Sequence, residues 1–216
     1  MLHGYNLPHI IKPKPLEITP KTKICILAPH ADDETIGCGG LLKKYGSQCD
    51  VILLTDGSKG GVASSPDEVR RIREAEFIQV MEYYKVHKYH FMRAKDGDLI
   101  SGYDLFKQLD FTPYDYVFMP HRQDCHKDHV VPQGFFRRLK RTNLKIRAKA
   151  VYYEVWGALP MPTHYLDISD VYSSKTEAMS FYKSQGNIDY ADRILALNHY
   201  RGIRHHVAYA ESYTIA

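Results

Sequence analysis

Short runs of consecutive apolar residues alternate along the chain with segments whose apolar positions repeat every three to four residues. An uninterrupted apolar run is typical of a strand buried on both faces, and the longer repeat is typical of an amphipathic helix. The runs predict strands at 23–28, 50–55, 89–92, 116–119, 148–155 and 165–168. The periodic segments predict helices at 35–45, 65–84, 128–139, 173–184 and 189–200. Ser65 followed by Pro66 has the residue types of a helix start.

The alternation of strand and helix predicts an α/β fold that is Rossmann-like, with a mostly parallel sheet flanked by helices in a single domain. The 216 residues suit one domain. Residues 1–22 contain four prolines and are expected to form an irregular arm, so the folded domain is expected to span residues 23–216. In such a sheet, the loops that follow the strands converge on one crevice, and candidate chemistry belongs there.

The composition is that of an ordinary globular protein, with 44% hydrophobic residues, 25% charged residues and a net charge of +4. The cationic stretch 137–147 could face nucleic acid, but a solvated helix face and the loop after it explain the pattern, so no nucleic-acid partner is predicted. The four cysteines form no CxxC pair, which is typical of thiols in a reducing compartment. With no signal-peptide pattern and no membrane span, the sequence predicts a cytoplasmic protein.

The segment 29–34, Pro-His-Ala-Asp-Asp-Glu, directly follows the first predicted strand. Three adjacent carboxyl groups at the mouth of an apolar strand raise one another's pKa, and a bound cation would relieve that repulsion. A helix N-terminus would also stabilise Asp33 and Glu34. It gives no reason for His30 at the strand exit, so the segment is a candidate for metal binding.

A second cluster, residues 120–129, follows the fourth predicted strand and contains three histidines and two aspartates. His126 and His129 are three residues apart and would share one face of a helical turn. Together the two clusters can supply two imidazoles and one carboxylate to a single ion, and three protein ligands with an open position are typical of catalytic zinc. The remaining acidic and imidazole groups suit a base for water and a donor to an oxyanion.

Residues 29–34 and 126–129 resemble the motifs of the LmbE-like, or PIG-L-like, N-acetylglucosaminyl deacetylases. Supporting matches to the same family are Thr55-Asp56-Gly57, Gly60, Arg73 with Glu76, Lys175 through Gln185, and Ala210-Glu211-Ser212-Tyr213. The resemblance covers about residues 23–213. It implies a LmbE-like deacetylase domain.

The resemblance also implies roles for the residues of the two clusters. Those expected to hold Zn²⁺, or another divalent metal, are His30, Asp33 and His129. Asp32 would be the general base that activates water. His126 would stabilise the oxyanion of the tetrahedral intermediate, and Asp128 would orient His126.

On the substrate side, the resemblance implies that Arg73 holds polar groups of the sugar. Asp124 and His121 are further candidates for substrate contact, and His121 could instead hydrogen-bond a metal ligand. Asp124 occupies the position at which some members of the family have a proton-donating tyrosine. The proton donor to the leaving amine is therefore open between Asp32 and His126.

The predicted function is zinc-dependent removal of the acetyl group from an N-acetylated amino sugar, free or linked to a nucleotide or a lipid, to give a free amine and acetate. The predicted partner is this small-molecule substrate, and a homo-oligomer is compatible with the sequence. One alternative is the same chemistry on a non-sugar amide, such as a thiol conjugate. Two others are a non-haem iron oxygenase that uses His30 and Asp32 with a distant histidine, and a non-enzymatic nucleotide-binding module built on the glycines at 37–40.

Overall fold

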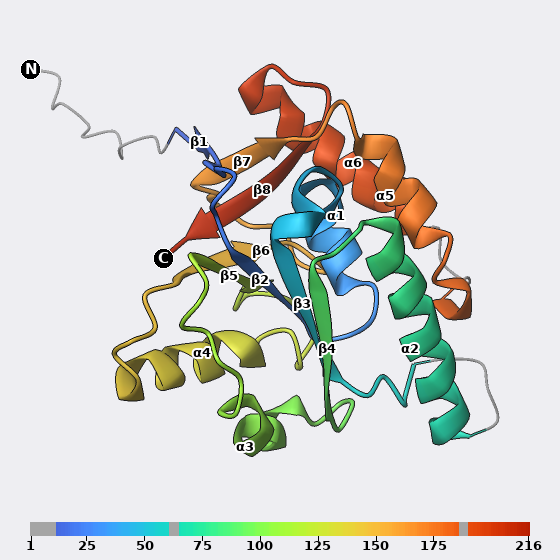
Figure 1. Ribbon diagram of the computed structural model, residues 1–216. Coiled ribbons are helices and arrows are strands. Elements are labelled where there is room, and N and C mark those ends of the chain that lie inside the picture. The colour runs from blue at the N-terminus through green and yellow to red at the C-terminus, as the bar shows by residue number, and fades with distance from the viewer. Residues whose placement is uncertain (1–11, 61–64, 186–189) are drawn as a thin grey trace, which may run out of the picture.

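The computed structural model describes residues 12–60, 65–185 and 190–216, which form an eight-stranded sheet with helices on both faces (Figure 1). The strands are β1 (Lys14–Pro15), β2 (Ile24–Ala28), β3 (Cys49–Thr55), β4 (Lys88–Ala94), β5 (Tyr116–Pro120), β6 (Lys149–Tyr153), β7 (His164–Asp167) and β8 (Ala210–Ile215). The helices are α1 (Asp33–Tyr45), α2 (Pro66–Tyr83), α3 (Tyr103–Phe106), α4 (Val131–Thr142), α5 (Tyr172–Met179) and α6 (Tyr190–Gly202). The predicted α/β class is confirmed.

The order of the strands places the site at the centre of the sheet. The order is β1-β7-β8-β6-β5-β2-β3-β4, and β2 pairs in parallel with β3 on one side and with β5 on the other. The chain runs outward from β2 through β3 and β4, and then crosses back to β5 and β6. The loops after β2 and β5 therefore turn in opposite directions, which leaves a crevice at the carboxyl ends of these two strands.

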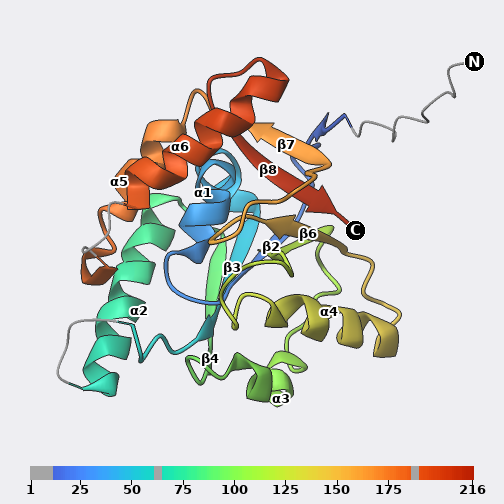
Figure 2. The same ribbon diagram turned by 180° about the vertical axis from the view of Figure 1, so that it is seen from behind.

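The residues of β2 show why its sequence is an uninterrupted apolar run. Ile24, Ile26 and Ala28 belong to the core beneath α1, α2 and α5, whereas Cys25 and Leu27 belong to the core beneath α3 and α4. Figure 2 shows α3 and α4 on one face of the sheet and the other helices on the opposite face. Because the strand is buried on both faces, every position along it is apolar.

Two strands of the sheet are additional to the six predicted. β8 runs antiparallel between β6 and β7 and carries the buried polar residues Glu211 and Ser212, which break its apolar pattern. β1 lies within the arm expected to be irregular and pairs with β7 at the sheet edge. Residues 1–11 of that arm lie outside the described residues.

The helices differ from the prediction where their ends serve the site. α1 begins at Asp33 instead of residue 35, and α4 begins at Val131 instead of residue 128, because residues 128–130 belong to the loop after β5. α5 ends at Met179 instead of residue 184. Beyond its end, the hydroxyl of Tyr182 donates to the buried carboxylate of Glu34, at 2.5 Å.

Other features of the sequence recur in the structure. Ser65 caps α2 as predicted, because its hydroxyl accepts a hydrogen bond from the Glu68 N–H at 3.2 Å. Of the unpaired cysteines, Cys125 is exposed and the others are buried. Within the described ranges, no helix combines the length and the apolar character that crossing a bilayer requires.

Candidate metal centre and active site

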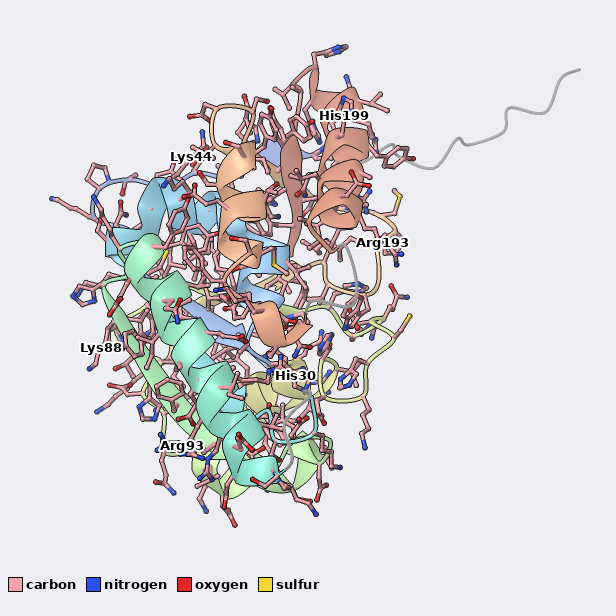
Figure 3. The ribbon with its side chains drawn as sticks, turned by 90° about the vertical axis from the view of Figure 1, so that its right-hand side faces the viewer. His30, Lys44, Lys88, Arg93, Arg193 and His199 are labelled. Carbon is pink, nitrogen blue, oxygen red and sulfur yellow. The ribbon has the colours of Figure 1, made fainter. Side chains whose placement is uncertain are left out.

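The loops that leave the carboxyl ends of β2, β4 and β5 meet at the central crevice. They are residues 29–32, 95–98 and 121–130. Figure 3 labels His30 below α5. The two clusters found in the sequence are therefore brought together, and a third loop joins them.

Three side-chain atoms from the two clusters form an equilateral triangle. His30 Nδ1 lies 3.3 Å from Asp33 Oδ2 and 3.3 Å from His129 Nε2, and His129 Nε2 lies 3.3 Å from Asp33 Oδ2. Around a tetrahedral zinc ion with bonds of about 2.0–2.1 Å, neighbouring ligand atoms stand about 3.3 Å apart. The three residues fit three corners of such a site and leave the fourth for water or substrate.

Two carboxylates hold the far side of the His30 ring. His30 Nε2 lies 3.3 Å from Asp96 Oδ1 and 3.4 Å from Asp128 Oδ2. Asp128 also accepts hydrogen bonds from the backbone N–H groups of Gly97 and Leu99, at 2.8 and 3.1 Å. Carboxylates behind an imidazole fix its tautomer and direct the other nitrogen to a metal. Asp96 was missed in the sequence, although its position two residues after the end of β4 was a usable signal.

Asp124 plays the corresponding part behind His129. Its Oδ1 lies 2.9 Å from His129 Nδ1 and accepts from the His126 N–H at 3.0 Å. Its Oδ2 accepts from the N–H groups of Trp156 and Gly157, at 2.9 and 3.1 Å. Both oxygens therefore face protein donors. The substrate contact expected of Asp124 stays a prediction.

His121 fastens the same segment from the other side. This buried ring places Nε2 2.7 Å from the carbonyl oxygen of Gly157, while Nδ1 accepts from the Gln123 N–H at 3.3 Å. A Cβ at Gly157 would stand 3.1 Å from His121 Nε2, so a larger residue there would have to push the ring away by a few tenths of an ångström. The structure uses His121 to anchor the segment after β6, and its expected substrate contact stays a prediction.

The charges of the triangle stabilise one another. Burial alone would raise the pKa of Asp33, but the neighbouring His129 and His30 outweigh it and hold that pKa well below its usual value. Burial works against protonated imidazoles, yet the carboxylates around them raise the pKa of His30 well above its usual value and that of His129 to about 9. In the metal-free protein, the ring protons thus supply the positive charge that a bound cation would supply in their place.

Asp32 occupies a strained position beside the triangle. Its φ of 136° and ψ of −29° are sparsely populated for a residue with a side chain. Burial raises the pKa of Asp32 to about 7, the charges of Asp33 and Glu34 act in the same direction, and the guanidinium of Arg73 opposes them. The result is a carboxyl group that exchanges its proton near neutral pH.

Arg73 supports the loop that carries Asp32. It donates to the carbonyl oxygens of Ala31 and Gly60, at 2.8 and 3.3 Å, and its Nη2 lies 3.8 Å from Asp32 Oδ2. A Cβ at Gly60 would stand 2.2 Å from the guanidinium, so a larger residue there would displace the end of the Arg73 side chain. The Nε of Arg73 has no hydrogen-bond partner in the part of the chain that the structure describes. The expected contact of Arg73 with substrate stays a prediction.

His126 stands edge-on to His30, with the ring centroids 4.7 Å apart, and equally close to His129. Its Nδ1 accepts from the Asp128 N–H at 3.3 Å, so the neutral ring carries its hydrogen on Nε2. Burial, followed by the nearby charges of His30 and His129, lowers the pKa of His126. The backbone of Asp128 makes the contact that was expected to orient His126, while its carboxylate faces His30.

A buried ion pair holds the bend in α1, the helix that carries Asp33. The helix departs from helical geometry at Cys38. Glu211 accepts from the N–H groups of residues 40–41, at 2.8 and 2.9 Å. Lys175 donates to the carbonyl oxygen of Ile36 at 2.9 Å and to Glu211 at 2.8 Å. The pair satisfies backbone groups that the bend would otherwise leave unpaired.

Comparison with known proteins shows the family to which the sequence is similar. The sequence profile of the PIG-L family, described as GlcNAc-PI de-N-acetylase, matches residues 25–139. A diacetylchitobiose deacetylase from Thermococcus kodakarensis is 29% identical to this chain over 193 residues, which cover 76% of this chain and 70% of that protein.

Solved structures share the fold at lower identity. The N,N'-diacetylchitobiose deacetylase from Pyrococcus horikoshii, solved with an inhibitor, has a TM-score of 0.77 at 23% identity over 90% of this chain and 84% of its own. The 4-carboxy-2-hydroxymuconate hydratase from Pseudomonas putida has a TM-score of 0.68 at 16% identity over 90% of this chain and 96% of its own. Because a deacetylase and a hydratase share this fold, the fold alone does not fix the reaction, and the site must decide it.

Proposed function

The chain belongs to the PIG-L family of de-N-acetylases, and we propose that it removes the acetyl group from an N-acetylated amino sugar in a metal-dependent hydrolysis. The observation that carries the proposal is the triangle of His30, Asp33 and His129, with its edges of 3.3 Å, beside the buried carboxyl group of Asp32. The first gives a place for a cation, and the second gives a base next to it.

Zinc is the ion that we propose for the triangle. Two imidazoles, one carboxylate and an open fourth position are typical of catalytic zinc, although other divalent ions accept the same donors. When bound, such an ion polarises the amide carbonyl and acidifies a water molecule. Asp96 and Asp128 would hold His30 for this purpose, and we assign Asp124 to His129 in the same way.

Asp32 is the group that we assign to proton transfer. Its buried carboxylate can take a proton from the attacking water, and its protonated form, which burial favours, can return that proton to the nitrogen as the C–N bond breaks. His126 Nε2–H is assigned to donate a hydrogen bond to the carbonyl oxygen as negative charge develops there. The products are acetate and an amine, and Asp32 ends in its starting form.

The relatives support the proposed substrate class. One of them is named for its action on diacetylchitobiose, an N-acetylated amino sugar, and the family is described by an N-acetylglucosamine conjugate. We propose the same class here, with the sugar hydroxyl groups on the Arg73 side of Asp32. The expected cytoplasmic location stays a prediction.

Acetate release from a panel of N-acetyl amino sugars, free, nucleotide-linked and lipid-linked, tests the proposal. Asp32→Asn should keep the metal and lower turnover about 10²–10⁴-fold, the usual contribution of a general base. Asp104→Asn is the matched control, because the side chain of Asp104 is 86% exposed. Wild-type rates in Asp32→Asn would exclude Asp32 as the base. A protein that binds metal but releases no acetate from any sugar would point to a non-sugar amide.

A further inference from the structure

The positive charge of the protein is concentrated in α4, the turn after it and β6. Residues 129–153 contain seven lysines and arginines and no acidic residue. Since the net charge of the whole chain is +4, all other residues together carry −3. A charge distribution as uneven as this one attracts negatively charged partners and orients the protein towards them.

Two of the seven cations have partners inside the protein. Lys140 donates to the carbonyl oxygen of Ala148 at 2.7 Å, which ties α4 to the residues just before β6. The guanidinium of Arg138 lies over the ring of Tyr103, 4.0 Å from the ring centroid. These contacts explain why the fold keeps a cation at positions 138 and 140.

Three other cations have no such explanation. Arg137 and Arg141 lie one helical turn apart on α4, and Lys145 follows four residues later in the turn after the helix. All three are exposed, and none of them forms an ion pair with a residue in the described ranges. A cation in the last turn stabilises the helix dipole, which accounts for Arg141 but not for Arg137 or Lys145.

An apolar side chain stands among these cations. Leu144 is 81% exposed, more than any other large hydrophobic residue that the structure describes. Its turn is held in place, because Asn143 Oδ1 accepts from the Lys145 N–H at 3.1 Å and the side chain of Ile146 is buried. The fixed turn therefore presents Leu144 and Lys145 to the solvent together.

The basic surface lies away from the metal centre. Figures 1 and 2 show α4 at the periphery of the molecule, on the face of the sheet that also carries α3. The helix begins two residues after His129, and its 12 residues span about 18 Å. A partner bound at the far end of α4 is thus separated from the metal triangle by the length of the helix.

We propose that Arg137, Arg141, Leu144 and Lys145 dock the protein on a membrane surface that contains anionic phospholipids. Basic residues on an amphipathic helix are attracted to the headgroups of such lipids, and a leucine can enter the boundary between headgroups and acyl chains. A nucleic acid would attract the same charges, but it offers no apolar phase for Leu144. None of the four residues is aromatic, so the surface also lacks a ring on which bases could stack. The docking goes beyond the proposed function and does not depend on the reaction at the metal centre.

Co-sedimentation of the full chain with vesicles tests the proposal. One set of vesicles mixes phosphatidylserine with phosphatidylcholine, and the other contains phosphatidylcholine alone. The wild-type protein should bind the mixed vesicles and leave the neutral ones unbound. Binding should weaken as salt is raised from about 0.1 M to about 1 M, because the screening length falls from about 10 Å to about 3 Å.

Removing the unpaired charges should abolish most of this binding. The triple variant Arg137→Gln, Arg141→Gln, Lys145→Gln should bind the mixed vesicles about 100-fold more weakly, at about fivefold for each basic residue near an anionic surface. These side chains are exposed and the substitutions keep their length, so the variant should fold, which circular dichroism checks.

A matched triple variant controls for the overall change in charge. Lys43→Gln, Arg71→Gln, Lys183→Gln removes three exposed cations from α1, α2 and the segment after α5, on the opposite face of the sheet. This variant has the same net charge as the first one, and it should bind the mixed vesicles as the wild type does.

Leu144 separates a lipid surface from a nucleic acid. Leu144→Ser should weaken vesicle binding about tenfold, the lower end of what burying a leucine contributes, and Leu144→Ile should retain it. A wild-type protein that does not bind mixed vesicles overturns the proposal, as does equal binding by the two triple variants. Binding to duplex DNA that is equally strong in Leu144→Ser, without binding to vesicles, would overturn it and assign the surface to nucleic acid.

Discussion

Replacing Asp124 by asparagine distinguishes its two candidate roles, that of holding His129 and that of contacting the substrate. In the wild type, Oδ1 faces His129 Nδ1 and the His126 N–H, while Oδ2 accepts two further N–H groups from residues 156–157. An amide has one acceptor oxygen and one NH₂ group. Whichever way it turns, the NH₂ group meets donors, so the substitution breaks one of the two pairs of contacts.

The magnitude follows from the contact that is lost. Removing the carboxylate behind a ligand histidine typically weakens metal affinity about 10–100-fold. The same substitution leaves buried N–H groups or His129 poorly paired, and each such group costs about 1–3 kcal/mol of folding free energy. Asp124→Asn should therefore bind metal about 10–100-fold more weakly and unfold at a lower denaturant concentration.

Metal affinity is measured by competition with a chromophoric chelator at fixed pH, with Asp104→Asn as the surface control. The rate constant kcat is then measured at saturating metal. If Asp124 serves His129, saturating metal should restore most of kcat, and KM for the sugar should change little. Wild-type metal affinity together with a raised KM would refute this reasoning and return Asp124 to the substrate-binding role that the sequence suggested.

Two further predictions concern charge inside the protein. Because the pKa of His129 is raised to about 9 in the metal-free protein, its charged form stabilises the fold fully below about pH 6.5, and this stabilisation is lost as the pH rises through 9. Urea unfolding of the metal-free protein should therefore show lower stability at pH 9.5 than at pH 6. If the same difference persists in His129→Gln, the pH dependence belongs to other groups. Lys175→Met leaves the buried Glu211 without its partner and should lower the free energy of unfolding by about 3–5 kcal/mol, measured with denaturant. Adding Glu211→Gln to Lys175→Met should recover part of this loss. Equal stability of the wild type and Lys175→Met would contradict the importance of the pair for the bend in α1.

The sequence predicts the central parallel strands well because their burial on both faces leaves an uninterrupted apolar run. It fails for β8, where the buried Glu211 is the partner of Lys175 and of backbone groups in α1. The hydrogen bond from the Gly40 N–H to Glu211, for example, joins residues 171 positions apart in the chain. No local sequence pattern predicts such a contact, so both β8 and the bend in α1 were missed.

The site shows the same division. The proximity of His30 and Asp33 is predictable because they are only three positions apart in the chain. The proximity of His129 is predictable once the strand order places its loop beside theirs. The path of the loop after β5 is not predictable in this way. Whether Asp124 turns towards the substrate or towards His129 depends on the N–H groups of residues 156–157, which are supplied by a segment that follows a different strand.

The segment after β6 supports the metal centre from outside the part of the chain that carries its ligands. All three residues of the metal triangle lie within residues 25–139, the stretch matched by the family profile. The N–H groups that hold Asp124 Oδ2 come from residues 156–157, beyond that stretch. Because Asp124 contacts both stretches and lies behind His129, Asp124→Asn is expected to weaken metal binding while KM for the sugar changes little. An unchanged metal affinity would show that the segment after β6 does not support the metal centre.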